Sequence, residues 1–267
     1  MAGATRIQAA FDRAAAEDRA ALIVYLTAGY PDLATSKACF EAAVEAGADV
    51  LEIGVPFSDP MMDGPVIQAA NQRVLDAGIG VGQQLELVAS LDHLDVPKLV
   101  MTYVTIADTR GYDRFAAEVA AAGCSGVILP DLPAPEAAPW LDAAADHDLA
   151  TVFLASSVSS DERLDALTAV SSGWVYATGL LGVTGVKSVA QDVTAALVDR
   201  VRARTDLPVA VGIGVKDRDS AAEVAAYADG VIVGSAIVKA AGAGDPAGAP
   251  ERVGALVREL RAGVGRG

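Results

Sequence analysis

The stretch Ala48–Pro65, ADVLEIGVPFSDPMMDGP, places a carboxylate inside an apolar run and follows that run with a loop rich in glycine, proline, serine and aspartate. Val50–Ile53 predicts a buried strand of a parallel sheet, in which apolar residues cover both faces. A charge inside such a strand costs several kcal/mol unless it is paired or neutralised. Glu52 therefore has a partner in the fold, or it faces a cavity where a carboxylate has a function.

A second carboxylate, Asp63, stands just before Gly64-Pro65 at the end of this loop. Proline suits the first turn of a helix, so the sequence places Asp63 between the C-terminal end of a strand and a helix start. Substrates bind at this position in barrels and in open α/β folds. Two structural alternatives remain, a helix cap for Asp63 and a buried ion pair for Glu52, although no obvious cation lies nearby in the sequence.

Size and composition limit the possible classes of protein. The chain has 267 residues, of which 52% are hydrophobic and 5% aromatic, and no composition shift marks a boundary, so residues 1–267 are predicted to form a single domain. The net charge of −15 disfavours nucleic acid and anionic membrane surfaces as partners. An anionic small substrate remains possible because backbone N–H groups can bind phosphate.

The sequence contains no sign of export or of a membrane anchor. No stretch reaches the roughly 18 uncharged apolar residues of a membrane span, and charged residues interrupt any signal peptide near the start of the chain. Cys39 and Cys124 lie in alanine-rich segments and are interpreted as core thiols, without a disulfide framework or a metal-binding spacing. We therefore expect a cytoplasmic protein without a metal.

A repeated alternation of strand and helix patterns predicts the fold. After an amphipathic helix at Met1–Ala20, about eight apolar runs are each followed by a helical pattern. The runs are Leu22–Leu26, Val50–Ile53, Lys98–Tyr103, Gly126–Leu129, Thr151–Leu154, Trp174–Ala177, Pro208–Val211 and Gly230–Val233. This rhythm favours a (β/α)₈ TIM barrel with an extra N-terminal helix. A Rossmann fold fits less well because no G-x-G-x-x-G follows the first run.

Three late glycine motifs are candidates for a phosphate site. They are Gly182-Val183-Thr184-Gly185, Gly212-Ile213-Gly214 and Gly234-Ser235. The last two follow strands seven and eight, the usual phosphate position of the barrel, and Ser235 opens a short helix with free N–H donors. Each motif alone is better explained as a tight turn, whereas three motifs that converge favour a phosphate site. The loop Thr178–Ser188 is also predicted to act as a mobile lid over the substrate.

The chemistry follows from the two carboxylates. Burial raises the pKa of one, while a polar loop leaves the other ionised, so the pair can divide acid and base roles. Tyr103 and Tyr176 end their strands and are candidates to close the cavity. A Schiff-base mechanism is disfavoured because Lys98 begins its strand at the wrong end. The residues alone thus predict a barrel enzyme for a phosphorylated small molecule, working by acid–base catalysis without metal.

The stretches quoted above resemble the tryptophan synthase alpha subunit family. The matching segments, in order, are Tyr25–Asp32, Leu51–Gln68, Pro130–Pro133, Gly182–Gly185, Val211–Gly214 and Asp229–Ser235. The resemblance spans nearly the whole chain, and the run around Glu52 and Asp63 is its most specific part. The chain departs from the usual family sequence after Tyr103, after the fifth strand and at the end of the sixth.

The resemblance implies an activity and a partner. The expected reaction is the cleavage of indole-3-glycerol phosphate to indole and glyceraldehyde 3-phosphate. Indole then passes to a beta subunit within an alpha2-beta2 heterotetramer. No cofactor is expected in this subunit, and pyridoxal phosphate is expected in the beta partner. Two alternatives remain, a free-standing lyase and a poorly active subunit that mainly activates its partner; the presence of both carboxylates counts against the second.

The resemblance also implies residue roles. Glu52 becomes the acid–base residue, and Asp63 becomes the partner of the indole N–H. The expected phosphate-binding residues are Thr184, Gly185, Gly214, Gly234 and Ser235. The expected lining of the substrate pocket is Tyr176, Tyr103, Leu22, Ile128 and Leu154. The loop expected to face the beta subunit contains Ser58, Asp59 and Pro60.

Overall fold

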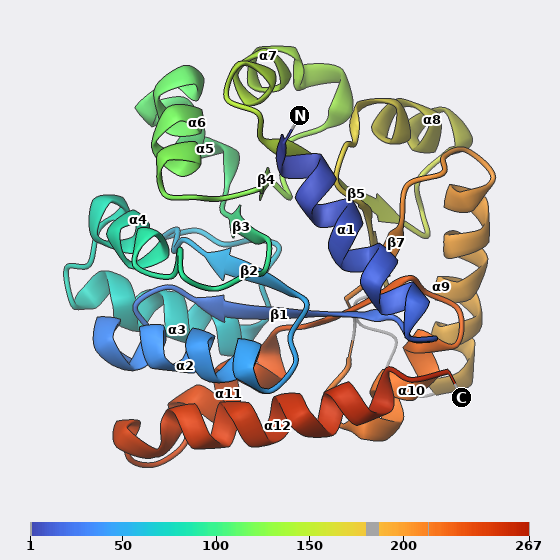
Figure 1. Ribbon diagram of the computed structural model, residues 1–267. Helices are drawn as coiled ribbons and strands as arrows, with labels where there is room; N and C mark the ends of the chain where they lie inside the picture. Colours follow the sequence, from blue (N-terminus) through green and yellow to red (C-terminus); the bar gives the residue numbers. More distant parts are fainter. Residues whose placement is uncertain (1, 180–186, 213, 267) are drawn as a thin grey trace.

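Eight parallel strands form a closed barrel in the computed structural model, which describes residues 2–179, 187–212 and 214–266 (Figure 1). Each strand pairs with the next one in the chain, and the eighth returns to pair with the first. The strands are β1 (Ala21–Thr27), β2 (Val50–Gly54), β3 (Lys98–Met101), β4 (Gly126–Ile128), β5 (Ala150–Ser156), β6 (Val175–Thr178), β7 (Val209–Val211) and β8 (Gly230–Val233).

Helices surround this barrel and follow the strands in the order that the sequence pattern predicted. They are α1 (Ala2–Ala16), α2 (Leu33–Glu45), α3 (Pro65–Asp76), α4 (Val81–Ala89), α5 (Val104–Arg110), α6 (Tyr112–Ala121), α7 (Ala138–Asp146), α8 (Asp161–Val170), α9 (Lys187–Arg202), α10 (Arg218–Ala225), α11 (Ser235–Gly242) and α12 (Ala249–Gly263), with 3₁₀ turns at Ala134–Glu136 and Pro246–Gly248. The predicted (β/α)₈ barrel with an extra N-terminal helix is confirmed. None of the helices within the described ranges is long and apolar enough to cross a membrane.

Alternate residues of the strands face two different layers. Outward-facing residues such as Leu22 and Leu51 pack in a large core between the barrel and the helices. Inward-facing residues such as Ile23 and Val50 belong to a smaller core inside the barrel. The register pairs Tyr25 of β1 with Glu52 of β2 on this inner face. Successive side chains of a strand point to opposite faces, so a residue's position in the strand decides whether its polar group reaches the interior.

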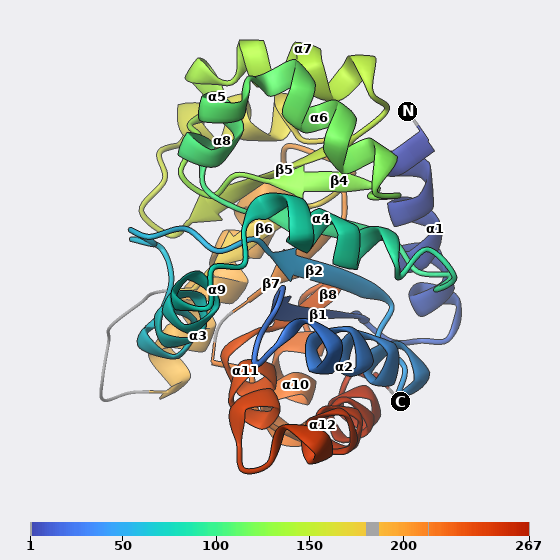
Figure 2. The ribbon, with the colours of Figure 1, turned by 90° about the vertical axis from the view of Figure 1, so that its left-hand side faces the viewer.

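Helix α1 lies across one end of the barrel (Figure 1). Its buried face joins the inner core, where the Phe11 ring lies 6.0 Å from the Trp174 ring, measured between centroids. In the second view α1 stands at the right-hand end, whereas α3 and the loop before it lie at the left-hand end (Figure 2). One end is thus closed by apolar packing, and the C-terminal ends of the strands are left for a site.

Candidate active site

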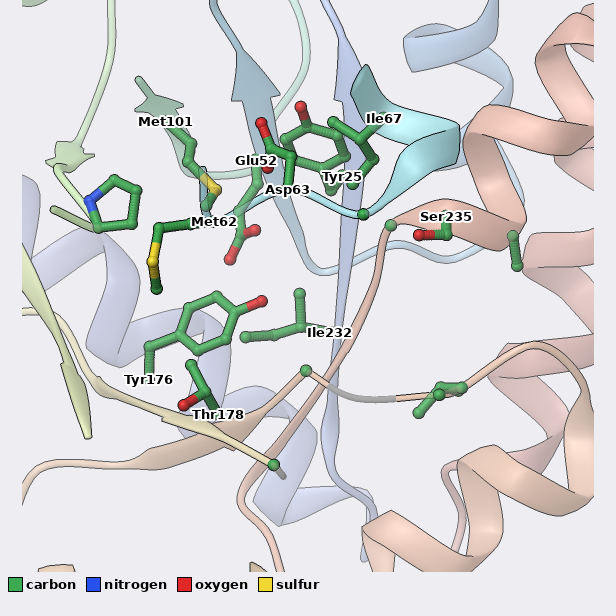
Figure 3. Close-up of a pocket in the computed structure, with 18 of the residues that line it drawn as sticks. Tyr25, Glu52, Met62, Asp63, Ile67, Met101, Tyr176, Thr178, Ile232 and Ser235 are labelled. Atoms are coloured by element: carbon green, nitrogen blue, oxygen red, sulfur yellow. The ribbon is translucent and has the colours of Figure 1, made fainter. Parts of the chain in front are cut away.

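A cavity of about 630 Å³ lies at the C-terminal ends of the strands. The strands contribute Tyr25, Glu52, Met101, Leu154, Tyr176 and Ile232 to its wall (Figure 3). The loops that follow the strands contribute further residues, among them Met62, Asp63 and Gly234. Both the volume and the mixture of apolar walls with a few polar groups are typical of small-molecule sites.

Glu52 places an unpaired carboxyl group in this cavity. The residue is fully buried, and neither oxygen has a hydrogen-bond partner among the described residues. Desolvation alone raises the pKa of Glu52 to about 8, because burial disfavours the charged form. The side chain points into the cavity, toward the hydroxyl of Tyr176 (Figure 3). Near neutral pH this group is therefore mainly a carboxylic acid with a proton to give.

Asp63 lies on the loop between β2 and α3, on the wall beside Tyr25 (Figure 3). Burial raises the pKa of Asp63 to about 6, while hydrogen bonds with Tyr103 and Asn71 lower it. The Asn71 Nδ2 donates to Asp63 Oδ2 over 3.3 Å. The N-cap position of α3 is occupied by Gly64, so Asp63 does not fill it. At pH 7 this carboxyl group is mainly ionised.

The two carboxyl groups therefore differ in charge although they share one cavity. Desolvation is the only cause of the shift in the pKa of Glu52, whereas Asp63 also accepts hydrogen bonds that favour its ionised form. Tyr25 and Tyr176, whose hydroxyls lie near both carboxyl groups, have raised pKa values because of burial first and the nearby carboxylates second. They remain protonated throughout the physiological range. The site can supply one acid and one anion at the same pH.

The opposite side of the cavity has the features of an anion site. Gly214, Gly234 and Ser235 line it, and Ser235 is the first residue of α11, where backbone N–H groups are free to bind an anion. Gly214 has a φ of 62°, a backbone conformation that favours glycine. Lys216 and Lys239 line the same region, and neither has an ion-pair partner within the described ranges. This is a local concentration of positive charge in an acidic protein.

A sequence model of the family described as tryptophan synthase alpha chain matches residues 11–264. The chain belongs to the tryptophan synthase alpha chain family. It is 46% identical over 261 residues to the tryptophan synthase alpha chain of Mycobacterium marinum, covering 98% of this chain and 95% of that protein. It is 49% identical over 253 residues to the one of Streptomyces avermitilis, covering 94% and 91%. A solved structure of Mycobacterium tuberculosis tryptophan synthase superposes with a TM-score of 0.90 at 46% identity, covering 98% of this chain and 99% of that chain.

The structure brings several of the predicted residues of this alpha-chain family member to the cavity, and it places others elsewhere. Glu52, Asp63, Leu154 and Tyr176 line the wall together with the described phosphate candidates. Tyr103 is buried behind the wall, where its ring lies 5.2 Å from Phe57 between centroids. Thr184 and Gly185 lie outside the described residues, as does most of the predicted lid at Thr178–Ser188.

Two of the predicted apolar pocket residues do not line the cavity. Ile128 lies inside the barrel, in the inner core, where the strand register pairs it with Val152 of β5. Leu22 is fully buried on the outer face of β1, in the layer between the strands and the helices. Neighbouring residues of a strand point to opposite faces, so Ile23 and Tyr25, not Leu22, face inward.

Sequence reasoning missed several residues that line the cavity of this alpha chain. Tyr25, Met62, Met101 and Ile232 complete its wall, and Lys216 and Lys239 stand at its anion-binding side. A signal existed for the lysines, because Lys216 follows Gly214 by two residues and Lys239 lies one turn into α11. The described residues contain no group of three or more histidine, cysteine or acidic side chains that could hold a metal ion.

Proposed function

We propose that this alpha chain cleaves indole-3-glycerol phosphate to indole and glyceraldehyde 3-phosphate, a lyase reaction with retro-aldol chemistry. The observation that carries the proposal is Glu52, a fully buried and unpaired carboxyl group with a pKa of about 8, which faces the cavity opposite an anion site. Membership of the tryptophan synthase alpha chain family supports the same reaction. The roles of the individual residues below are part of this proposal.

Glu52 acts first as an acid and then as a base. It donates its proton to C3 of the indole ring and then accepts the proton of the hydroxyl on the carbon bonded to C3. The bond between C3 and that carbon breaks, its electron pair returns to the indole ring, and the hydroxyl carbon becomes the aldehyde. One proton is given and one is taken, so Glu52 ends protonated. Acid–base help of this kind contributes roughly 10²–10⁴-fold.

Asp63 complements this step by remaining ionised. Its carboxylate accepts a hydrogen bond from the indole N–H and stabilises the positive charge that forms when C3 is protonated. The pKa of about 6 leaves Asp63 negative at neutral pH, while Glu52 is still protonated. The apolar side chains of Leu154, Met101 and Ile232 suit the indole ring.

Gly214, Gly234 and Ser235 hold the phosphate, together with Thr184 and Gly185, which the structure does not describe. A matched pair of variants tests this site. A side chain at Gly234 would meet Tyr25 and Ile67 only at ordinary contact distances of 3.4 and 3.6 Å, so Gly234→Ala tests space and Gly234→Asp adds charge. We expect the KM of Gly234→Asp to rise about tenfold or more above that of Gly234→Ala, because the added carboxylate repels the phosphate at close range. Equal KM values would remove Gly234 from the phosphate site.

We further propose that indole passes to a beta subunit carrying pyridoxal phosphate, in an alpha2-beta2 heterotetramer, while the alpha chain itself needs no cofactor. Ser58, Asp59 and Pro60 form the loop that faces this partner. Ser58 and Asp59 are exposed, and the adjacent Met61 is 84% exposed, which supports a role in an interface because large apolar side chains gain by being covered. Residence in the cytoplasm and a single domain over residues 1–267 stay predictions.

Release of indole from indole-3-glycerol phosphate, measured with and without a tryptophan synthase beta subunit from the same source, tests the function. Slow release alone and a large increase with the partner support the two-component synthase. Fast release at a rate that the partner does not change indicates a free-standing lyase. Activation of the partner without indole release indicates a subunit that mainly activates its partner. The absence of both indole release and activation would overturn the proposal.

A further inference from the structure

A buried row of polar side chains connects Tyr25 to Asp63. The Tyr25 hydroxyl lies 3.4 Å from Thr27 Oγ1, Thr27 Oγ1 donates to Asn71 Oδ1 over 3.1 Å, and Asn71 Nδ2 donates to Asp63 Oδ2 over 3.3 Å. Tyr25, Thr27 and Asn71 are only 5%, 0% and 3% exposed. The row thus joins β1, α3 and the loop that carries Asp63. Its two ends, Tyr25 and Asp63, line the cavity (Figure 3).

The direction of each hydrogen bond in the row is fixed by chemistry. An ionised carboxylate only accepts, so Asn71 must present its NH₂ group to Asp63 and its oxygen to Thr27. Thr27 has a single hydroxyl proton, which it gives to Asn71 Oδ1. Its oxygen can then only accept from the Tyr25 hydroxyl. All three donors therefore point toward Asp63, and bonds aligned in this way reinforce one another.

We propose that Thr27 and Asn71 are positioning residues, with Tyr25 behind them, that hold the Asp63 carboxylate toward the indole N–H and keep it ionised. Thr27 fixes the amide of Asn71, since a reversed amide would turn an oxygen lone pair toward the carboxylate. Asp63 has a further hydrogen bond with Tyr103, which stands outside this row. The inference rests on the proposed function, because it assigns Asp63 a substrate contact.

The same row contributes to the difference between the two carboxyl groups, together with the hydrogen bond between Asp63 and Tyr103. The Tyr25 proton is committed to Thr27, so this hydroxyl cannot also donate to Glu52, whose oxygens have no partner among the described residues. Gly54 makes the arrangement possible, because a Cβ at that position would overlap the Tyr25 hydroxyl. Tyr25 thus supports the charge on Asp63 through the row and gives no hydrogen bond to Glu52.

Thr27→Val tests the proposal, because valine keeps the branched shape of threonine and removes the donor. Thr102→Val is the matched control: Thr102 is 2% exposed, follows β3, and donates to the backbone oxygen of Val55, outside the row. We expect Thr27→Val to lower kcat about 10- to 100-fold, as the loss of support for a charged group does. Thr27→Ser, which restores the hydroxyl, should recover most of the rate.

The pH profile of kcat/KM separates positioning from general damage. The titratable groups facing Asp63 are Glu52, Tyr25, Tyr103 and Tyr176, with Lys216 and Lys239 on the opposite side of the cavity. Burial raises the pKa values of the three tyrosines, so they stay neutral below pH 9, and Glu52 governs the alkaline limb. Without the Thr27 hydroxyl, the Asn71 amide is no longer held with its NH₂ group toward Asp63. The hydrogen bond that favours the ionised carboxylate is then weaker, which raises the pKa of Asp63 and moves the acidic limb to higher pH in Thr27→Val, but not in Thr102→Val.

A second variant and a second measurement keep the test decisive. Tyr25→Phe removes only the first donor of the row, so we expect a smaller loss of kcat and a smaller shift in the same direction. Titration of the Asp63 carboxyl carbon by NMR should show a higher pKa in Thr27→Val than in the wild type, and it needs no substrate. If the wild type releases no indole, the proposed function fails while this titration still tests the row. An Asp63 pKa and a rate in Thr27→Val equal to those of Thr102→Val would overturn the inference.

Discussion

The two ends of the barrel differ in what their buried polar groups can do. At the closed end, Phe11 of α1 packs on Trp174, whose buried indole Nε1 has no partner within the described ranges. At the open end, the buried carboxyl group of Glu52 likewise has none. A tryptophan N–H cannot titrate, so at the closed end the missing partner affects stability alone. A carboxyl group responds by shifting its pKa, and the same lack of a partner creates an acid.

The largest effect should come from Glu52→Gln, which removes the titrating group and nearly keeps its shape. We expect kcat for indole release to fall by about 10²–10⁴-fold, because glutamine can neither give nor take the proton. Binding of a glycerol-phosphate ligand should persist, since the anion site lies on the other side of the cavity. Single-turnover kinetics and ligand titration measure the two effects, and turnover like that of the wild type would remove Glu52 from the mechanism.

Phe11→Ala should change the closed end only. Phe11 is 5% exposed and belongs to the inner core, so its truncation should lower the free energy of unfolding by about 3–5 kcal/mol. The kcat per folded molecule should stay within about twofold of the wild type, because no residue of the cavity is altered. Denaturant unfolding and an activity assay test the two claims, with Phe11→Leu as a milder control. A large loss of kcat would mean that the two ends are coupled.

The strand and helix rhythm predicted the barrel because each strand is apolar and short, and each helix pattern follows a glycine, proline or aspartate signal. The short helix α5 was missed. Its Val104, Thr105 and Ile106 are β-branched and form helices poorly, and its first N–H group is held by Asp131 Oδ1 over 2.8 Å. Asp131 comes from a later loop, and a contact across 27 residues leaves no local signal.

The catalytic candidates were predictable because a glutamate inside a buried strand is costly and therefore informative. Which apolar residues face the cavity was not predictable from the sequence. All seven residues of β1 are buried, so the alternation between the inner and outer layers leaves no mark in the sequence. Only the register with Glu52 shows that Tyr25 faces inward. For the same reason the row through Thr27 and Asn71 could not be predicted, as it needs a strand and a helix brought together.

The dependence of stability on pH should distinguish the two ends. The folded-state pKa of Glu52, about 8, lies above its usual value of 4.5, so the folded protein holds this proton more tightly than the unfolded chain. The stability of the wild type relative to Glu52→Gln is therefore highest below pH 4.5, and it falls as the pH rises to about 8. At pH 7 we expect Glu52→Gln to be more stable than the wild type by about 3 kcal/mol.

Unfolding experiments at pH 5, 7 and 8 measure this difference, with Phe11→Ala as the comparison. The loss caused by Phe11→Ala should be the same at each pH, because no titrating group is removed. A constant difference between the wild type and Glu52→Gln from pH 5 to 8 would mean that Glu52 gains a partner that neutralises its burial.

The smallest effect should come from Lys216→Gln at the anion side of the open end. Lys216 is exposed and lines the cavity beside Gly214, so water and salt weaken its attraction for a phosphate. We expect KM to rise about two- to fivefold at low salt with kcat unchanged, and the effect to vanish at high salt. Lys37→Gln on α2 makes the same change of charge away from the cavity, and it should leave KM unaltered. Equal KM values for the two variants would leave the backbone N–H groups as the main hold on the phosphate, so that the open end would recognise its anion without side-chain charge.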